Sequence, residues 1–146
     1  MSFKTWMLAH VPPPLADALV RAKRRILPSP GFRRMRAIHD SLGRPQEILA
    51  GPFKGMRYLD AAGHLPKVLG AFENELSGAI EQLCALEPDV ILNIGSAEGF
   101  YAVGLARRLP QTKVIAYDIA KLPRYRLAKL ARLNNLAGRD ARDSSR

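Results

Sequence analysis

The chain has 146 residues, of which 47% are apolar and 25% charged, and this composition is typical of one globular domain at most. It contains no apolar run near the ~18 residues that a membrane span needs. Its single cysteine, Cys84, excludes an intramolecular disulfide and a cysteine-based metal cluster, and we expect it to pack in the core. Cysteine usage favours a reducing cytoplasm.

The net charge of +10 is unevenly distributed along the chain. Residues 1–50 carry a net charge of +6, residues 51–100 of −4 and residues 101–146 of +8. Basic segments of this kind can bind RNA or an acidic partner, or can form a solvated arginine-rich surface. Only two aromatic residues, Phe32 and Tyr125, lie close to the basic clusters, which favours the solvated surface.

Residues 1–46 predict an N-terminal helical region. A helix is expected over residues 15–27, because its apolar residues share one face and its basic C-terminal end suits the helix dipole. A second helix is expected over residues 32–42, with Gly43 as its C-cap. A basic amphipathic helix can lie on a membrane surface, but packing against a domain is the more common arrangement.

Residues 47–86 predict a flap and two helical segments ahead of the main sheet. Residues 47–59 have the pattern of a β-hairpin with its turn at residues 51–55. A helical turn follows at residues 65–69, and an amphipathic helix is expected over residues 72–86. The residues of this helix that we expect to face inward are Leu76, Ile80 and Leu83.

A β-α-β unit is predicted between Pro88 and Asp118. The apolar run at residues 90–94 is typical of a buried strand in a parallel sheet. Helical spacing follows over residues 98–109, and a second apolar strand at residues 113–117 ends at the lone acid. Such a unit should cross over right-handed.

The turn at residues 95–99 has the residue types that a nucleoside-bearing cofactor needs. Gly95 can adopt unusual dihedral angles and leaves room for a ligand near the backbone. Free N–H groups at the start of the next helix would face that ligand, and Asp118 can accept two hydrogen bonds from ribose hydroxyls. Asp118 follows Gly99 by nineteen residues, close to the roughly 20 expected of a ribose-binding acid. A glycine turn of this kind also occurs in α/β proteins that bind no nucleotide.

The pattern N-x-G-x-x-x-G at residues 93–99 lacks the middle glycine of a dinucleotide fingerprint, which disfavours a nicotinamide cofactor. It resembles the first motif of class I S-adenosylmethionine-dependent methyltransferases. It is most similar to the FkbM-like branch, in which an aromatic pair, here Phe100 and Tyr101, often follows the last glycine. The resemblance covers about residues 70–138 and implies a doubly wound, Rossmann-like fold. It implies that S-adenosylmethionine is held by Asn93, Gly95, Ser96, Ala97, Glu98, Gly99 and Asp118.

Two details qualify this resemblance. Asn93 stands where the family usually has an acid, although its amide carbonyl can still accept a hydrogen bond. The run at residues 70–76 also resembles the segment that precedes the first motif in FkbM-like proteins. Glu73 is therefore a further candidate for the cofactor site, although a place at a helix start also explains an acid there.

The segment after Asp118 predicts one more helix, over residues 122–136, with Gly138 as its cap. No apolar periodicity follows, so the last residues should be disordered. We therefore divide the chain into an N-terminal helical region (1–46), a partial methyltransferase cofactor-binding domain (47–138) and a tail (139–146).

In the fold that this sequence resembles, a third strand and the second half of the sheet follow. Here two parallel strands are predicted, so we expect an N-terminal part of a methyltransferase, inactive and marginally stable by itself. No catalytic base and no methyl acceptor can be identified from the residues. The alternative function is a non-enzymatic basic module that binds RNA or an acidic partner.

Overall fold

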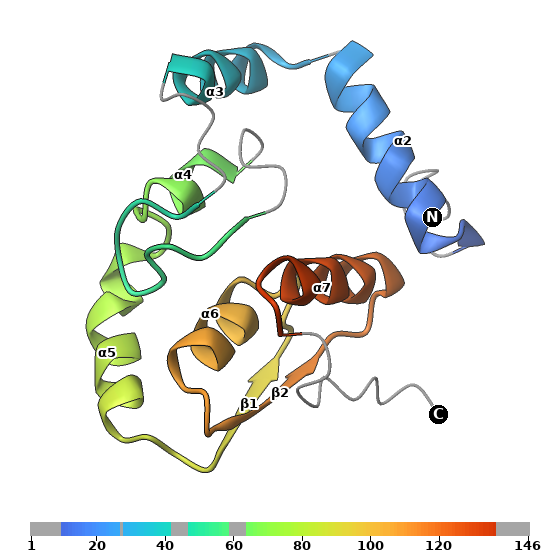
Figure 1. The fold of residues 1–146 in the computed structure, drawn as a ribbon. Coiled ribbons are helices and arrows are strands. Elements are labelled where there is room, and N and C mark those ends of the chain that lie inside the picture. The colour runs from blue at the N-terminus through green and yellow to red at the C-terminus, as the bar shows by residue number, and fades with distance from the viewer. Residues whose placement is uncertain (1–9, 27, 42–46, 59–63, 137–146) are drawn as a thin grey trace.

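The computed structural model describes residues 10–26, 28–41, 47–58 and 64–136. It is a mixed α/β structure, in which these residues form a two-stranded parallel sheet, six α-helices and one short 3-10 helix (Figure 1). In chain order the elements are α2 (Pro13–Ile26), α3 (Pro30–Ser41), α4 (Leu65–Val68), the 3-10 helix η2 (Asn74–Leu76), α5 (Ser77–Ala85), β1 (Val90–Ile94), α6 (Phe100–Arg108), β2 (Lys113–Tyr117) and α7 (Lys121–Leu133).

The predicted β-α-β unit is confirmed, and both strands have the bounds expected from the sequence. Val90 lies opposite Lys113 and Ile94 opposite Tyr117, so β1 and β2 pair in parallel over their full length. Because the strands run in the same direction, their carboxyl ends meet at one edge of the sheet. The expected caps Gly43 and Gly138 and the tail at residues 139–146 lie outside the described residues.

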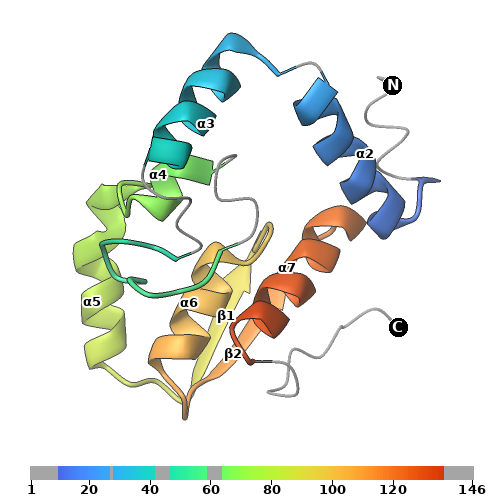
Figure 2. The ribbon, with the colours of Figure 1, turned by 45° about the horizontal axis from the view of Figure 1, so that its top comes forward.

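Helices cover one face of the sheet. Figures 1 and 2 show α6 and α7 side by side over the two strands, with α5 on the outer side of α6. The apolar core lies under this helical layer and continues into the loop at residues 47–58. Its members include Ile48, Phe53, Met56, Tyr58, Cys84, Ile91, Phe100, Val103 and Leu130. The expectation that Cys84 is a core residue is confirmed, and burial raises the pKa of its thiol.

The opposite face of the sheet is open among the described residues. Val90, Leu92 and Ile94 are 53%, 59% and 72% exposed, whereas Ile91, on the helical side, is buried. On β2 the neighbouring Ile115 and Tyr117 are exposed as well. The prediction of a buried strand is therefore confirmed for the face that the helices cover and is wrong for the other face. A continuous apolar run indicates that both faces can be covered, but it cannot show that both are.

Two helices start later than their apolar periodicity predicted. The backbone at Glu73 is left-handed, with a φ of 47°, so the segment expected as a helix from residue 72 begins as η2 and becomes α-helical at Ser77. Leu76 consequently lies on the surface, contrary to expectation, while Ile80 and Leu83 pack against the core as predicted. α6 begins only at Phe100, because the turn before it contains several residues with positive φ.

The expected β-hairpin is present only as a turn with one antiparallel bridge, between Glu47 and Arg57. The Ile48 N–H donates to the Met56 carbonyl, and the Gly55 N–H donates to the Ile48 carbonyl. Residues 47–58 contain no strand, and Ile48, Phe53, Met56 and Tyr58 are buried in the core. The second arm was predicted to reach residue 59, which lies outside the described residues.

The two predicted N-terminal helices are confirmed as α2 and α3. α2 packs against α7, more than a hundred residues later in the chain, and α3 lies near α4 in both views (Figures 1 and 2). None of the described helices combines the length and apolar character that crossing a membrane would take.

A pair of helical glycines tests the packing of α6 on the loop. A Cβ added at Gly104 would lie 2.5 Å from ring atoms of Phe53, whereas one added at Gly78 in α5 would meet nothing within 4 Å. Gly104→Ala should lower the free energy of unfolding by about 1–2 kcal/mol, because overpacking outweighs the gain in helix propensity. Gly78→Ala should raise it by about 0.5–1 kcal/mol. Chemical denaturation measures both, and equal shifts for the two variants would contradict this packing.

Candidate functional site

The chain between β1 and α6 forms a tight turn across the ends of both strands. Gly95, Ala97 and Gly99 all have positive φ, at 71°, 47° and 93°. The Ser96 N–H donates to the carbonyl of Tyr117, the last residue of β2, over 2.9 Å, and the Gly99 N–H donates to the Ser96 carbonyl over the same distance. The turn is therefore fixed against the neighbouring strand.

The two glycines of this turn have different structural roles. A Cβ at Gly99 would lie 2.8 Å from the Leu127 side chain, so Gly99 allows α6 and α7 to pack closely. A Cβ at Gly95 would meet nothing within 4 Å. Gly95 is therefore the position at which the backbone is open to an approaching ligand, and its positive φ is one that glycine adopts without strain.

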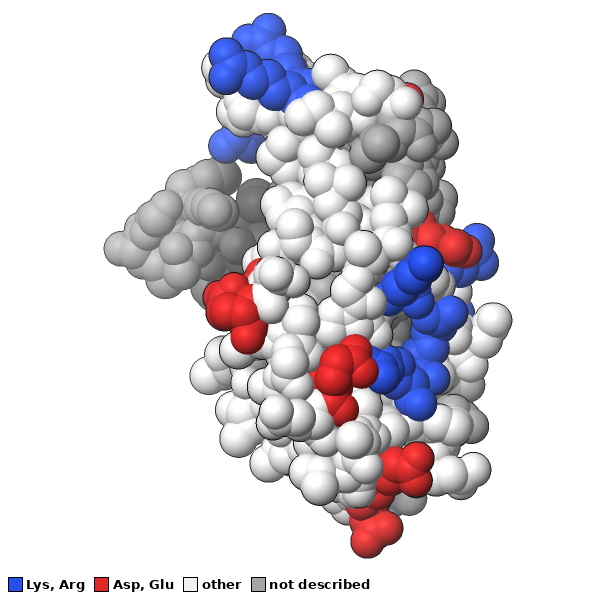
Figure 3. Space-filling model, turned by 90° about the vertical axis from the view of Figure 1, so that its left-hand side faces the viewer, with Lys and Arg blue, Asp and Glu red and all other residues white. Residues whose placement is uncertain are grey.

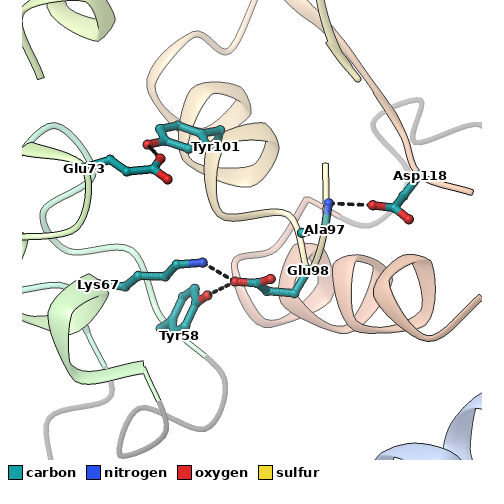
Figure 4. Close-up of polar contacts among 7 residues, drawn as sticks. All are labelled: Tyr58, Lys67, Glu73, Ala97, Glu98, Tyr101 and Asp118. Carbon is teal, nitrogen blue, oxygen red and sulfur yellow. Dashed lines mark hydrogen bonds and ion pairs between the residues drawn. The ribbon is translucent and has the colours of Figure 1, made fainter. Parts of the chain in front are cut away.

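Asp118 connects the turn to the start of α7. Its Oδ2 accepts a hydrogen bond from the Ala97 N–H over 2.9 Å (Figure 4). Its Oδ1 accepts one from the Ala120 N–H over 2.8 Å. A carboxylate offers about four lone-pair sites, so each oxygen can accept one more hydrogen bond. The contact with Asp118 also holds Ala97 in the left-handed conformation, which costs a non-glycine residue roughly 1–2 kcal/mol.

Two polar oxygens near the turn are buried without a hydrogen-bond partner among the described residues: Asn93 Oδ1 and Ser96 Oγ. Asn93 lies on the helix-covered face of β1, and Ser96 is the second residue of the turn. An unpaired buried polar group costs about 1–3 kcal/mol, and native proteins rarely leave one without a role. Both oxygens are enclosed by the protein, so in this conformation they are not open to a ligand.

Glu98 has its own set of contacts on the other side of the turn. Its Oε1 accepts a hydrogen bond from Tyr58 Oη over 2.5 Å and pairs with the Lys67 ammonium (Figure 4). The Lys67 nitrogen also lies 4.5 Å and 5.0 Å from the ring centres of Phe72 and Phe100, a cation–π geometry. Burial by itself would raise the pKa of Glu98, but hydrogen bonds from Lys67 and Tyr58 outweigh it and lower that pKa to about 2.

Glu73 pairs with Tyr101, not with the turn. The Tyr101 hydroxyl donates to Glu73 Oε2, and Figure 4 shows this pair across α6 from Asp118. Burial raises the pKa of Tyr101, and the Glu73 carboxylate raises it further. The structure therefore explains Glu73 by its position ahead of η2 and by its contact with α6.

The structure brings together most of the residues expected at a cofactor. Gly95, Ser96 and Ala97 lie beside Asp118, and Asn93 lies two residues before Gly95. The side chain of Glu98 points away from Asp118 toward α4 (Figure 4). Its partners, Tyr58 and Lys67, are far from Glu98 in the sequence, and no sequence pattern indicates that these side chains meet.

Basic side chains form small groups on the face seen in Figure 3, with acidic groups and uncharged surface between them. Arg108 makes a two-pronged ion pair with Glu81, with N–O distances of 2.6 and 2.8 Å. Arg107 donates to the carbonyl of Lys54. Among the described residues, this face offers no continuous basic track for a nucleic acid backbone.

Comparison of the chain with protein-family models, with curated proteins and with solved structures gives no match.

The low pKa of Glu98 predicts a pH-dependent stability. Because the folded-state pKa of about 2 is below the ordinary glutamate pKa of 4.5, the Glu98 contribution to stability is fully present above about pH 4.5 and is lost as the pH falls toward 2. At most about 3 kcal/mol is involved. Glu98→Gln should remove this part of the pH dependence of the unfolding free energy, as measured by denaturation between pH 2 and 6.

Glu81→Gln is the matched control for this experiment. Glu81 also pairs with a base, Arg108, but at the surface, where solvent screens the pair. Its replacement should leave the acid dependence almost unchanged. If Glu98→Gln and the parent lost stability in parallel below pH 4.5, the Glu98 contacts would not be the source of that dependence.

Proposed function

We propose that the turn after β1, together with Asp118, binds S-adenosylmethionine, and that the chain carries the cofactor-binding part of a class I methyltransferase. The observation that carries this proposal is the open backbone at Gly95 beside a carboxylate at the end of the neighbouring strand. This is the position at which α/β sheets bind nucleosides, outside the carboxyl ends of their strands.

The residues of the site fit the groups of this cofactor. Asp118 retains acceptor capacity for ribose hydroxyls after its two backbone contacts. The N-terminus of α6 has no side-chain cap, so its first N–H groups remain available to a ligand carboxylate.

The division of roles among these residues follows from their contacts. Gly95 admits the ligand, Asp118 orients its ribose, and Gly99 holds α6 against α7. Glu98 acts through the Lys67 and Tyr58 contacts that fix the turn, so it is a positioning residue. When bound, S-adenosylmethionine supplies a methyl group on a sulfonium that an acceptor nucleophile can displace.

A dinucleotide is a poorer fit to this turn. A pyrophosphate would require a free N–H and no side chain at the middle of the turn. That position is Ala97, which has a methyl group and whose N–H already donates to Asp118. Titration with NAD under the conditions used for S-adenosylmethionine separates the two assignments, and tighter binding of NAD would refute this one.

Replacing Asp118 tests the ribose contact. Asp118→Ala should weaken S-adenosylmethionine binding by about 1–3 kcal/mol, the loss expected for charge-assisted hydrogen bonds, as measured by calorimetry on the whole chain. Asp118→Asn keeps one acceptor oxygen and should lose less. Asp89→Ala, an acid just ahead of the opposite end of β1, is the control and should leave the affinity unchanged.

Asp118→Ala also removes the contact with Ala97, so each variant needs a thermal unfolding curve beside its titration. Equal affinity in a folded Asp118→Ala variant and in the parent would exclude Asp118 from the cofactor site.

A further inference from the structure

Apart from the proposed cofactor site, a pocket lies where α2 meets α7, on the side of the turn that faces away from Asp118. Its volume is about 60 Å³, and since about 10–15 Å³ holds one water, it has room for a small polyatomic anion. Its polar lining comes mainly from Asp17, Arg21, Tyr58, His64, Arg126 and Lys129. The cofactor proposal assigns no role to Asp17, Arg21, Arg126 or Lys129.

Among the described residues, the lining of this pocket has an excess of positive charge. Asp17, only 5% exposed, pairs with Arg21 of its own helix over 3.0 Å. It also pairs with Arg126 over 2.9 Å and with Lys129 over 3.5 Å, both on α7. One carboxylate cannot neutralise three cations. Glu98 also borders the pocket, but its charge is matched by Lys67.

The cations retain unused hydrogen-bond donors. Arg126 donates through Nε to Asp17, and among the described residues its other four N–H groups have no acceptor. Arg21 Nη2 lies 3.0 Å from Asp17 Oδ2. The side chains of Arg126 and Lys129 are 24% and 29% exposed, compared with 7% for Asp17. The cations, more than the carboxylate, are therefore accessible to a ligand, and their partial burial limits screening by salt.

A phosphate group matches this arrangement. The two guanidinium groups each provide a planar set of N–H donors, and the ammonium provides a compact positive charge. Proteins bind tetrahedral oxyanions with this combination of groups. We propose that the pocket between α2 and α7 binds a phosphate group, either as free phosphate or as the monoester of a small molecule. Asp17 is paired with the same three cations, so its carboxylate competes with the phosphate for them.

Binding at this position would join the two ends of the described chain. Arg21 belongs to the N-terminal helix, whereas Arg126 and Lys129 belong to α7. A phosphate that contacts all three would add an ionic link to the packing of α2 on the β-α-β unit. S-adenosylmethionine has no phosphate, so this site is separate from the proposed cofactor site and does not depend on it.

Calorimetry on the 146-residue chain tests the proposal, with inorganic phosphate and glycerol 3-phosphate as probes at low ionic strength. Sodium chloride at matched ionic strength is the blank. Phosphate should bind and should raise the unfolding midpoint, because a ligand that binds only the folded state stabilises it. Tighter binding of the monoester would identify a phosphorylated small molecule as the ligand, and equal binding would identify phosphate itself.

Three variants test which residues of the pocket determine the affinity for phosphate. Arg21→Gln, which changes the most exposed of the three cations, should weaken phosphate binding about tenfold through loss of a charge-assisted contact. Arg132→Gln removes an exposed base from α7 outside the pocket and should change the affinity less than about twofold. Asp17→Asn removes the competing carboxylate and should strengthen binding, provided that circular dichroism shows unchanged helicity.

The proposal is overturned if the parent chain shows neither heat nor a shift of the unfolding midpoint with either probe. It is also overturned if Arg21→Gln and Arg132→Gln weaken binding equally, because that result would indicate a general cationic surface. Arg21→Gln and Arg132→Gln both keep Asp17 paired with Arg126, so this comparison holds even where Asp17→Asn loses its fold.

Discussion

The contact between Glu98 and Lys67 is the interaction on which the arrangement of this chain depends. A single carboxylate oxygen connects the turn after β1, the helix α4 and the loop that contains Tyr58. A buried ion pair is costly to desolvate and is stable only when further hydrogen bonds complete it. Here Tyr58 supplies one, and the rings of Phe72 and Phe100 pack around the ammonium. The pair therefore specifies one position of the loop relative to the turn.

Much of the fold could be predicted from local patterns. The bounds of β1 and β2 agree with the expectation because proline, glycine and a lone acid delimit two short apolar runs. The helices were found by their apolar periodicity, and their ends moved where the backbone became left-handed, as at Glu73. The Rossmann-like fold remains a proposal, since the described sheet has two strands and larger α/β folds share this unit.

The remaining features depend on partners far away in the chain, which periodicity does not show. Gly95 and Gly99 belong to the same glycine turn and look equivalent in the sequence. A Cβ added at Gly95 would face open space, whereas one added at Gly99 would meet the Leu127 side chain. Glu98 was grouped with the cofactor residues because it is in the turn, but Lys67 determines its direction. The loop at residues 47–58 has the sequence pattern of a β-hairpin, but it forms no strand and its apolar side chains pack in the core. In each case tertiary packing overrides a correct local pattern.

The open face of the sheet also affects how stability changes with temperature. The heat-capacity change of unfolding grows with the apolar area that unfolding newly exposes to water. Val90, Leu92 and Ile94 are already more than half exposed in the folded chain, so they add little to that change. A smaller heat-capacity change gives a flatter curve of unfolding free energy against temperature. The chain should therefore gain less from the hydrophobic effect near room temperature than its apolar content indicates, and its stability should also fall less steeply on cooling.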